Sequence, residues 1–308
     1  MKDRTVKTLR YSVTVVIIIS LVYLANLEEI LSHLSNVKPE IYSLAVIVFL
    51  TVYLWSALRW KALISGLDYE ITLQESIKTI AMSYGFNKIL PMNSGDLTRS
   101  KLMERYTEID SHGKVLGAVA MERFLDIVFL GVLTAASSFY LLGKTGNLAW
   151  IFVTAGVLTL LMISVRLKNR FFVNIIEFNE SLGAPRKITE FLKESLRGYK
   201  EIPRSKLAEV FLWTSLRWLS GILVLYILSS SLGTPISLWG AALVTGVMSM
   251  VSALPITPAG IGPVEAMGTG ILVVLGLSSA QAASLVILQR SLGFILMGVI
   301  GALVYSLD

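Results

Sequence analysis

The sequence contains no cysteine among its 308 residues and only two histidines, His33 and His112. Without cysteine the chain has no disulfide framework, no thiolate nucleophile and no sulfur ligand for a metal. Two histidines leave almost nothing from which to build a zinc site, a haem site or a Ser-His-Asp triad. The sequence therefore points away from most familiar kinds of catalysis, and we expect no metal, no cofactor and no enzymatic activity.

Charged residues are also scarce: they make up 16% of the chain, while apolar residues make up 54%. A soluble domain usually has about 45–50% apolar and about 25% charged residues. This composition excludes an ordinary soluble enzyme and a disordered chain. The ATP-binding motif Gly-x-x-x-x-Gly-Lys-Ser/Thr does not occur, so we expect any energy source to be an ion gradient or a lipid gradient.

What the sequence does contain is a series of apolar segments, each close to the about 20 residues that a transmembrane helix needs. A basic stretch precedes the first of them, as in a signal peptide, but Glu28-Glu29 stands where a small-residue cleavage site would be. We therefore predict an all-α polytopic membrane protein that forms one integral membrane domain over residues 1–308. Its six full transmembrane helices are expected at residues 11–27, 41–64, 115–142, 148–165, 207–232 and 281–307.

Two further segments, 72–98 and 238–277, are predicted to be re-entrant or broken helices. The first is too polar for lipid and leads into Pro91, while the second contains three prolines and two glycines within residues 255–263. Proline interrupts the hydrogen bonds of a helix. Non-helical backbone persists at membrane depth only inside protein or beside a water-filled cavity. Both segments therefore mark a protein-lined interior.

The two broken segments resemble each other. Ile71-Thr72-Leu73 precedes Pro91 much as Ile236-Ser237-Leu238 precedes Pro255, and Glu122-Arg123 follows the first as Gln289-Arg290 follows the second. Because three full spans separate them, they should enter from opposite faces, which predicts an inverted-topology repeat. Its halves are residues 1–165 and 207–308. A second similarity, between residues 54–60 and 212–218, fits this repeat less well, since Arg59 falls near a helix end and Arg217 near a helix middle.

Basic residues orient the chain in the membrane. Four lysines and arginines precede residue 11, nine lie within residues 59–123 and ten lie within residues 166–206. If the N-terminus is cytoplasmic, all of these are cytoplasmic or at that interface, and the opposite loops hold only Lys38 and Lys144. We therefore expect both termini in the cytoplasm.

Residues 166–206 form a polar insert, which we interpret as a cytoplasmic amphipathic linker. Apolar residues recur in it at helical spacing, and basic residues take the other positions. Such a helix either lies on the anionic cytoplasmic leaflet or packs against its own protein.

Two arginines fall deep within apolar runs. Arg217 lies ten residues into one run and Arg290 nine residues into another, which places each about 14–15 Å from the start of its run. Each needs a carboxylate or an anion, because a charge at that depth costs at least about 2.5–3.5 kcal/mol. Glu265 is the only acid within residues 210–307, so an anionic substrate or a second acid such as Asp126 must complete the site. Arg59, near a helix end, we interpret as an interfacial anchor.

Helix N-termini at the broken segments offer a second way to hold an anion. Pro263 suits the first position of a helix whose first turn contains Glu265, and another helix is expected to begin near Gly95. The unpaired N–H groups of two opposed N-termini, together with Arg99, would cradle a phosphate. Alternatively, Asp96 and Glu265 satisfy these N–H groups themselves or exchange protons during transport; the sequence leaves these alternatives open.

Three motifs in order resemble the flippase-like membrane domain of lysyl-phosphatidylglycerol synthases (the multiple peptide resistance factors), a domain that also occurs alone in bacteria and archaea. The resemblance covers about residues 40–305, and the family usually has a Gly-Gly pair where Ala259-Gly260 stands. The motifs are Asn87-x-x-Leu90-Pro91-x-x-x-Gly95-Asp96-x-x-Arg99, Glu122-Arg123-x-x-Asp126 and Pro255-x-x-Pro258-Ala259-Gly260-Ile261-Gly262-x-x-Glu265.

The resemblance implies that the protein moves a lipid between the leaflets of the inner membrane of a prokaryotic cell. The implied substrate is an anionic phospholipid, such as an aminoacylated one, or a polyprenyl-phosphate-linked glycan. The residues expected to form the site are Arg217 and Arg290 together with the motif residues Asn87, Pro91, Asp96, Arg99, Glu122, Arg123, Asp126, Pro255, Pro258, Gly260, Gly262 and Glu265. The aminoacyl-transferase domain of the synthases is not seen in this sequence, so we do not expect lysyl transfer.

We therefore expect a flippase or transporter that binds lipids but no nucleic acid, with a second copy or a cytoplasmic enzyme as further partners. Two alternatives come from other classes of protein. One is a membrane enzyme that acts on a lipid phosphate with Mg²⁺ held by Glu122 and Asp126. The other is a noncatalytic scaffold that binds a cytoplasmic enzyme through the helix of residues 166–206.

Overall fold

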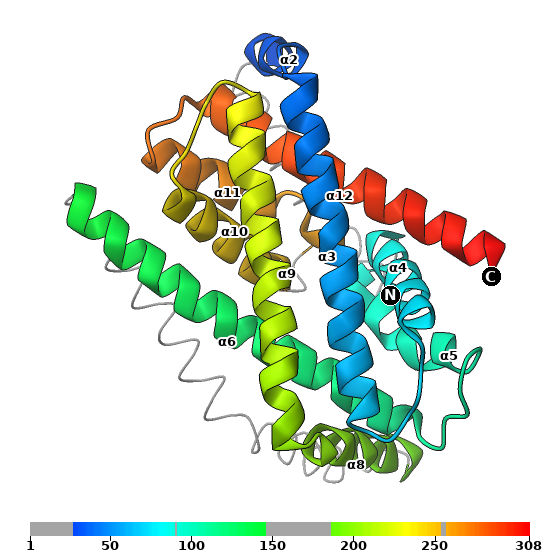
Figure 1. Cartoon of the computed structure of the whole chain (residues 1–308). Coiled ribbons are helices and arrows are strands. Elements are labelled where there is room, and N and C mark those ends of the chain that lie inside the picture. Colours follow the sequence, from blue (N-terminus) through cyan, green and yellow to red (C-terminus); the bar gives the residue numbers. More distant parts are fainter. Residues whose placement is uncertain (1–26, 90, 146–185, 254–256) are drawn as a thin grey trace, which may run out of the picture.

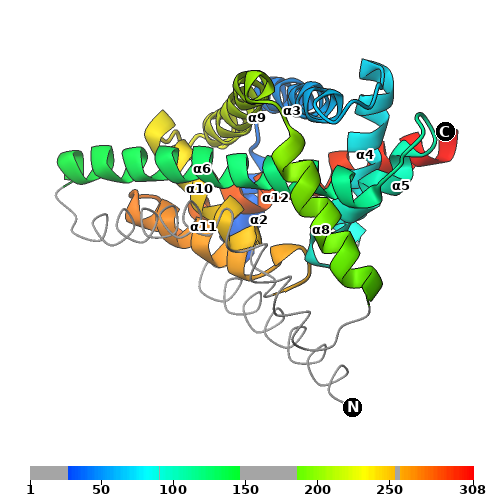
Figure 2. The same cartoon turned by 90° about the horizontal axis from the view of Figure 1, so that it is seen from below.

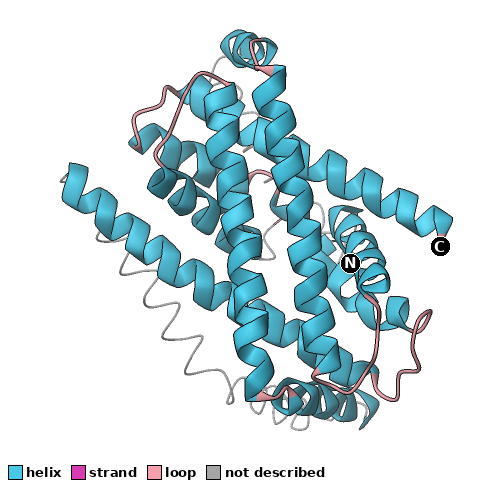
Figure 3. Ribbon diagram, in the orientation of Figure 1, coloured by secondary structure: helices cyan, strands magenta, loops and turns pink. Residues whose placement is uncertain are grey.

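The computed structural model describes residues 27–89, 91–145, 186–253 and 257–308, and every regular element in these ranges is helical (Figure 3). The predicted spans 11–27 and 148–165 lie outside the described residues, apart from Leu27. The helices, labelled in Figure 1, are α2 Leu27–Ser35, α3 Pro39–Ser65, α4 Leu73–Ile89, η1 Pro91–Thr98, α5 Arg99–Met103, α6 His112–Thr145, α8 Arg186–Glu201, α9 Arg204–Ser231, α10 Leu238–Ala253, η2 Pro258–Gly260, α11 Pro263–Val274 and α12 Ser279–Leu307, where η marks a 3₁₀-helix.

Four of these helices are long and apolar enough to cross a membrane: α3, α9, α12 and residues 112–141 of α6. They coincide with four of the six predicted spans and confirm a multi-pass membrane protein. Large apolar side chains remain exposed along them, such as Ile47 on α3, Leu212 on α9 and Ile295 on α12. This apolar surface is what a lipid environment requires.

Helices α3 and α9 pack against each other and run antiparallel (Figure 1). Trp55 of α3 stacks on Trp213 of α9, with ring centroids 5.8 Å apart and ring planes 9° apart. The side chains of Thr51 and Trp55 both hydrogen-bond to Ser220 across the same interface. The two tryptophans occupy equivalent positions in the similar segments 54–60 and 212–218. Our expectation that this similarity fits the repeat poorly is therefore wrong.

The other helices also pack in equivalent pairs, as expected if the two halves of the chain are related by a two-fold axis. Helix α4 packs on α12 as α10 packs on α6, and α3 contacts α4 as α9 contacts α10. The breaks η1 and η2 contact each other. Small residues permit the two equivalent contacts: Gly85 of α4 faces Gly301 of α12, and Gly246 of α10 faces Thr134 of α6. This arrangement supports the predicted inverted repeat.

The first break differs in detail from the prediction. Helix α4 ends at Ile89, and residues 91–98 form a 3₁₀-helix before α5 begins at Arg99. We expected an α-helix to begin near Gly95, but the next α-helix begins only at Arg99. A Cβ at Gly95 would lie only 2.4 Å from the carbonyl oxygen of Ser83, so a side chain has no room there. The absence of a side chain at Gly95 thus allows the 3₁₀-helix η1 to pack closely against α4.

The second break is a left-handed turn. Ala259, Gly260 and Gly262 have φ angles of 51°, 69° and 98°, a region in which glycine costs least. This geometry explains the Gly-Gly pair that the resemblance leads one to expect at residues 259–260. Pro263 then opens α11 at its first position, as predicted. Pro255 lies outside the described residues, while Pro258 begins η2.

Helix α8, the described part of the 166–206 linker, lies across the start of α6 (Figure 2). The crossing is close because Gly113 and Gly117 of α6 and Gly198 of α8 have no side chain; a Cβ on any of them would lie 2.3–2.5 Å from the other helix. Of the two interpretations of this segment, the structure shows packing against its own protein. Figure 1 places α8 beside the end of α3 and the start of α9.

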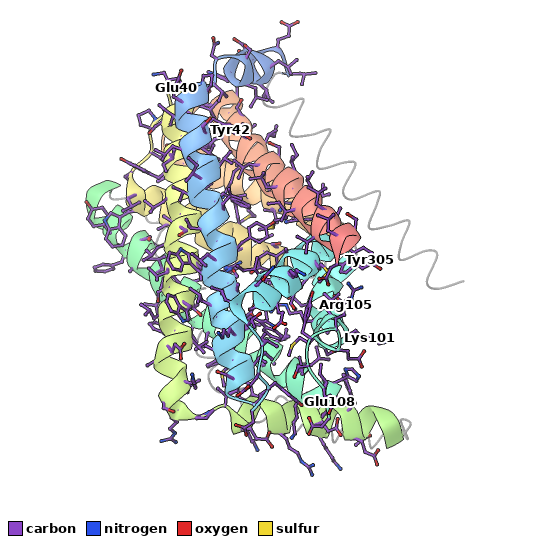
Figure 4. The ribbon with its side chains drawn as sticks, turned by 45° about the vertical axis from the view of Figure 1, so that its right-hand side comes forward. Glu40, Tyr42, Lys101, Arg105, Glu108 and Tyr305 are labelled. Atoms are coloured by element: carbon purple, nitrogen blue, oxygen red, sulfur yellow. The ribbon has the colours of Figure 1, made fainter. Side chains whose placement is uncertain are left out.

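The end of α12 is held beside α4 and the loop after α5. Tyr305 packs on Arg105, whose guanidinium lies 5.4 Å from the ring centroid (Figure 4). Asp308 accepts hydrogen bonds from Lys78 at 2.5 Å and from the Tyr106 hydroxyl at 2.5 Å. Donation by Lys78 and then by Tyr106 lowers the pKa of the Asp308 carboxyl to about 2, so this contact is charged at neutral pH.

Candidate functional site

Three arginines and three carboxylates form a closed network at the meeting point of α3, η1, α5 and α6. Each carboxylate contacts at least two of the arginines. The nitrogen–oxygen distances are 2.6 Å for Arg59–Glu122, 2.6 Å for Arg59–Asp126, 3.0 Å for Arg99–Asp96, 2.7 Å for Arg99–Glu122, 2.5 Å for Arg123–Asp96, 3.6 Å for Arg123–Glu122 and 3.2 Å for Arg123–Asp126. The opposite charges are equal in number, so the network is neutral.

The network is almost entirely removed from solvent. The side chains of Arg59, Arg99 and Glu122 are 0% exposed, whereas that of Arg123 is 41% exposed. The face of Trp60 covers Arg99, with the guanidinium carbon 4.9 Å from the ring centroid. The interpretation of Arg59 as an interfacial anchor is therefore wrong. Arg59 and Glu122 are both interior residues held by other charges.

Neighbouring polar groups fix the acids of this network. The side-chain amide of Asn87 donates to Asp96 at 2.9 Å, and the backbone N–H of Asp96 donates back to Asn87 at 3.2 Å. Asp126 accepts a further hydrogen bond from the indole N–H of Trp218 at 2.7 Å. All of the predicted site residues from α6 and Asn87, Asp96 and Arg99 are thus brought together. Asp126 completes the network around Arg59, however, and not a site with Arg217 and Arg290.

A second cluster lies beside the second break. Arg290 of α12 donates to Glu265 of α11 at 2.7 Å and to the carbonyl oxygen of Ala259 at 2.9 Å. The other oxygen of Glu265 accepts the backbone N–H of Gly262 at 2.6 Å, which satisfies one N–H group at the N-terminus of α11. The phosphate that we expected on this helix N-terminus would meet a carboxylate there. Of the two alternatives, the structure supports the one in which Glu265 satisfies the N–H groups itself.

Arg217 on α9 has no acidic partner in the described part of the chain. Its Nε donates a long hydrogen bond of 3.4 Å to the hydroxyl of Tyr84, and its guanidinium lies 4.0 Å from the ring centroid of Trp218. Its Nη1 is buried and makes no hydrogen bond. Unpaired donors of this kind are costly in an interior, and Nη1 of Arg217 lacks an acceptor.

Sequence reasoning missed one cation of this site, Lys88. It lies at the end of α4, close enough to Arg217 and Arg290 to be repelled by both. Its ammonium is 4.7 Å from the ring centroid of Phe294, which also packs on Arg290 at 4.9 Å. The available signal was a lysine inside a broken membrane segment, a position where a charge usually has a function; we took it only as a sign of polarity.

The second cluster therefore carries unbalanced positive charge. Of Lys88, Arg217 and Arg290, only Arg290 has a carboxylate partner, Glu265, among the residues that the structure describes. Two positive charges remain without a partner. A half-buried group of guanidinium and ammonium donors is suited to bind phosphate.

Comparison with known proteins decides the family. The family model described as "Lysylphosphatidylglycerol synthase TM region" matches residues 10–301. The chain belongs to this family. The resemblance noted from the three motifs is thereby confirmed.

Several archaeal proteins are similar to this member of the family over nearly their whole length. The UPF0104 membrane protein PH1989 of Pyrococcus horikoshii is 22% identical over 94% of this chain and 93% of its own. The UPF0104 membrane protein MJ1595 of Methanocaldococcus jannaschii is 24% identical over 96% of this chain and 93% of its own. A UPF0104 membrane protein of Methanothermobacter thermautotrophicus is 22% identical over 96% of this chain.

The geometry assigns different tasks to the motif residues of this family member. Asn87, Asp96, Arg99, Glu122, Arg123 and Asp126 bind one another. Gly260 and Gly262 shape the second break by their backbone angles, and Pro91 and Pro258 begin the two 3₁₀-helices. Lys88, Arg217 and Arg290 lie outside the neutral network.

Proposed function

We propose that the protein moves a lipid with an anionic phosphate head group between the leaflets of the membrane, and that Lys88, Arg217 and Arg290 bind this phosphate. One observation carries the proposal: Arg217 has a buried nitrogen without a hydrogen-bond acceptor and has no acidic partner among the described residues. In this proposal the protein is a transporter and not an enzyme, and it acts in the cell membrane of a prokaryote.

The chemistry of the site favours phosphate over a neutral ligand. A guanidinium presents paired N–H donors that match two phosphate oxygens, and an ammonium adds a compact charge. Hydrogen bonds to charged groups contribute about 1.5–3 kcal/mol each. A lipid phosphate is also available at the membrane surface, and its acyl or prenyl chain can remain against the apolar faces of the exposed helices.

The architecture supports movement of the bound lipid. The two breaks η1 and η2 contact each other near the cations, where the two inverted halves meet. In many transporters such halves rock about a central site and open it to each side in turn. A lipid or ion gradient would then supply the energy.

The test is transbilayer movement of a labelled anionic lipid. We expect the double variant Arg217→Gln/Arg290→Gln to slow the movement of NBD-labelled phosphatidylglycerol by at least about tenfold, because loss of a single charge-assisted hydrogen bond of 1.5 kcal/mol already accounts for that factor. The measurement is reduction of the label by external dithionite in proteoliposomes of phosphatidylcholine that contain the full chain.

A matched control replaces two exposed arginines, Arg197 on α8 and Arg204 at the start of α9, by glutamine. This control removes the same charge and should leave the rate unchanged. NBD-labelled phosphatidylcholine reports movement without the anionic group. Equal rates for the wild type and the Arg217/Arg290 variant, or no movement by the wild type of any anionic lipid, would contradict the proposal.

The alternative of a Mg²⁺-dependent enzyme is not favoured by the geometry. Glu122 contacts three arginines and Asp126 contacts two arginines and an indole. Their oxygens are therefore occupied by donors that a metal would have to displace. In the described part of the chain, no three acidic or histidine side chains are placed to share a metal ion.

A further inference from the structure

The two charged clusters occupy equivalent positions in the inverted repeat. Arg59 and Arg217 are the sixth residues of the similar segments 54–60 and 212–218, on the symmetry-related helices α3 and α9. Arg123 and Arg290 each follow an acid or amide, on the related helices α6 and α12. Two of the three arginines of the first network, Arg59 and Arg123, therefore have counterparts in the second half.

The acids are not the same. Glu122 precedes Arg123, whereas Gln289 precedes Arg290. Asp126 lies one turn beyond Glu122, whereas Gly293 lies one turn beyond Gln289. The second half thus keeps counterparts of Arg59 and Arg123 but has neutral residues where α6 has its two carboxylates.

The ion pairs reflect this difference, although Nη2 of Arg59 and Oε1 of Glu122 in the first half also lack a hydrogen bond. In the first half, Arg59 lies 2.6 Å from oxygens of both Glu122 and Asp126. In the second half, Nη1 of Arg217 and Oε1 of Gln289 are both buried and neither makes a hydrogen bond. Helices α9 and α12, which hold these two residues, contact each other. The second half therefore resembles the first half without the carboxylates of Glu122 and Asp126.

We infer that Gln289 is the residue that keeps the second half open to an anionic head group. A neutral amide at the position of Glu122 leaves Arg217 without a carboxylate, and the lipid phosphate takes the place that Glu122 takes beside Arg59. An amide can present either its oxygen or its N–H₂ group after rotation about its last torsion, so Gln289 donates to the phosphate once it is bound. This inference rests on the proposed function and identifies the residue that determines its specificity for anions.

The deciding experiment replaces Gln289 by glutamate, a change of one atom that recreates the first-half arrangement. Q289E is expected to pair with Arg217, to keep the fold, and to reduce both binding and movement of NBD-labelled phosphatidylglycerol by at least about tenfold, because a carboxylate repels the phosphate and occupies its arginine. The neutral variant Q289M should retain the rate within about threefold, since it loses only the one hydrogen bond to the amide.

The matched control is Gln281→Glu on the same helix. Gln281 accepts the backbone N–H of Ser278 in the capping box of α12, and glutamate serves equally well there. Q281E should move the lipid at the wild-type rate. Gel filtration and thermal unfolding in detergent establish that each variant is folded.

The outcomes separate this inference from the proposed function. If wild-type protein does not move or bind the anionic lipid, the proposed function fails whatever Q289E does. If the wild type is active and Q289E is equally active, the inference is overturned while the proposed function stands. A Q289E protein that does not fold also overturns it, because a Glu–Arg pair at this place should be accommodated as it is in the first half. If Q289M loses as much activity as Q289E, the shape of residue 289 and not its charge determines lipid movement, and the inference is overturned.

Discussion

Replacing Glu122 by glutamine is expected to destabilise the protein by about 3–5 kcal/mol, the usual cost of removing one partner from a buried ion pair. Glu122 is fully buried and contacts Arg59 at 2.6 Å and Arg99 at 2.7 Å, both of them fully buried as well. Glutamine keeps the shape but leaves three arginines with two carboxylates. The excess positive charge has no route to solvent except through Arg123, whose side chain is partly exposed.

The measurement is the midpoint of thermal or denaturant unfolding in detergent, with tryptophan fluorescence as the signal that reports unfolding. The matched control is Glu209→Gln, which breaks the exposed pair with Lys206 and should cost no more than about 1 kcal/mol. A second variant, Arg59→Gln/Glu122→Gln, removes one charge of each sign and should recover part of the loss, as expected for coupled residues. Equal stability of E122Q and E209Q would show that the network does not depend on its charge balance.

Replacing Gly301 by valine is expected to separate α12 from α4. A Cβ at Gly301 would lie 2.7 Å from both the carbonyl oxygen of Ala81 and the Cα of Gly85, and backbone atoms cannot move aside as a side chain can. Overpacking of this kind costs about 1–3 kcal/mol and shifts the backbone. Because Lys88 lies one turn beyond Gly85 on α4 and Arg290 lies on α12, the same change should also weaken the binding of an anionic lipid.

The comparison is with Gly298→Val on the same helix, where an added Cβ meets nothing within 4 Å. Both variants have the same change in helix propensity, so the difference between their unfolding midpoints reports the close approach alone. A lower midpoint for Gly301→Val than for Gly298→Val is expected. If the two midpoints coincide, the contact between α4 and α12 is not as close as the structure shows.

Much of the fold could be predicted from the sequence, because membrane spans are encoded locally. A run of about 20 apolar residues is sufficient to indicate a span, and α3, α6, α9 and α12 follow their predicted segments closely. The breaks were equally predictable, since prolines and glycines act on the backbone at their own position. The repeat was recognised from the residues before and after each break.

The pairing of charges could not be predicted in the same way. Arg59 was judged by its distance from a helix end, which estimates depth but says nothing about which face of α3 is covered by α6. Asp126 was offered to Arg217 and Arg290 because these lacked an acid, although it bonds to Arg59, Arg123 and Trp218. The similarity between residues 54–60 and 212–218, which we set aside, would have linked Arg59 to Arg217 and shown that two clusters exist.

Two consecutive residues of α9 connect these clusters. Arg217 bonds to Tyr84 on the side of the unpaired cations, while the indole of the next residue, Trp218, bonds to Asp126 in the neutral network. Tyr84 in turn donates to Ser56 of α3. The same turn of α9 therefore carries one side chain into each cluster. Any shift of this turn about the helix axis would alter the contacts of both clusters at once, without any moving loop between them.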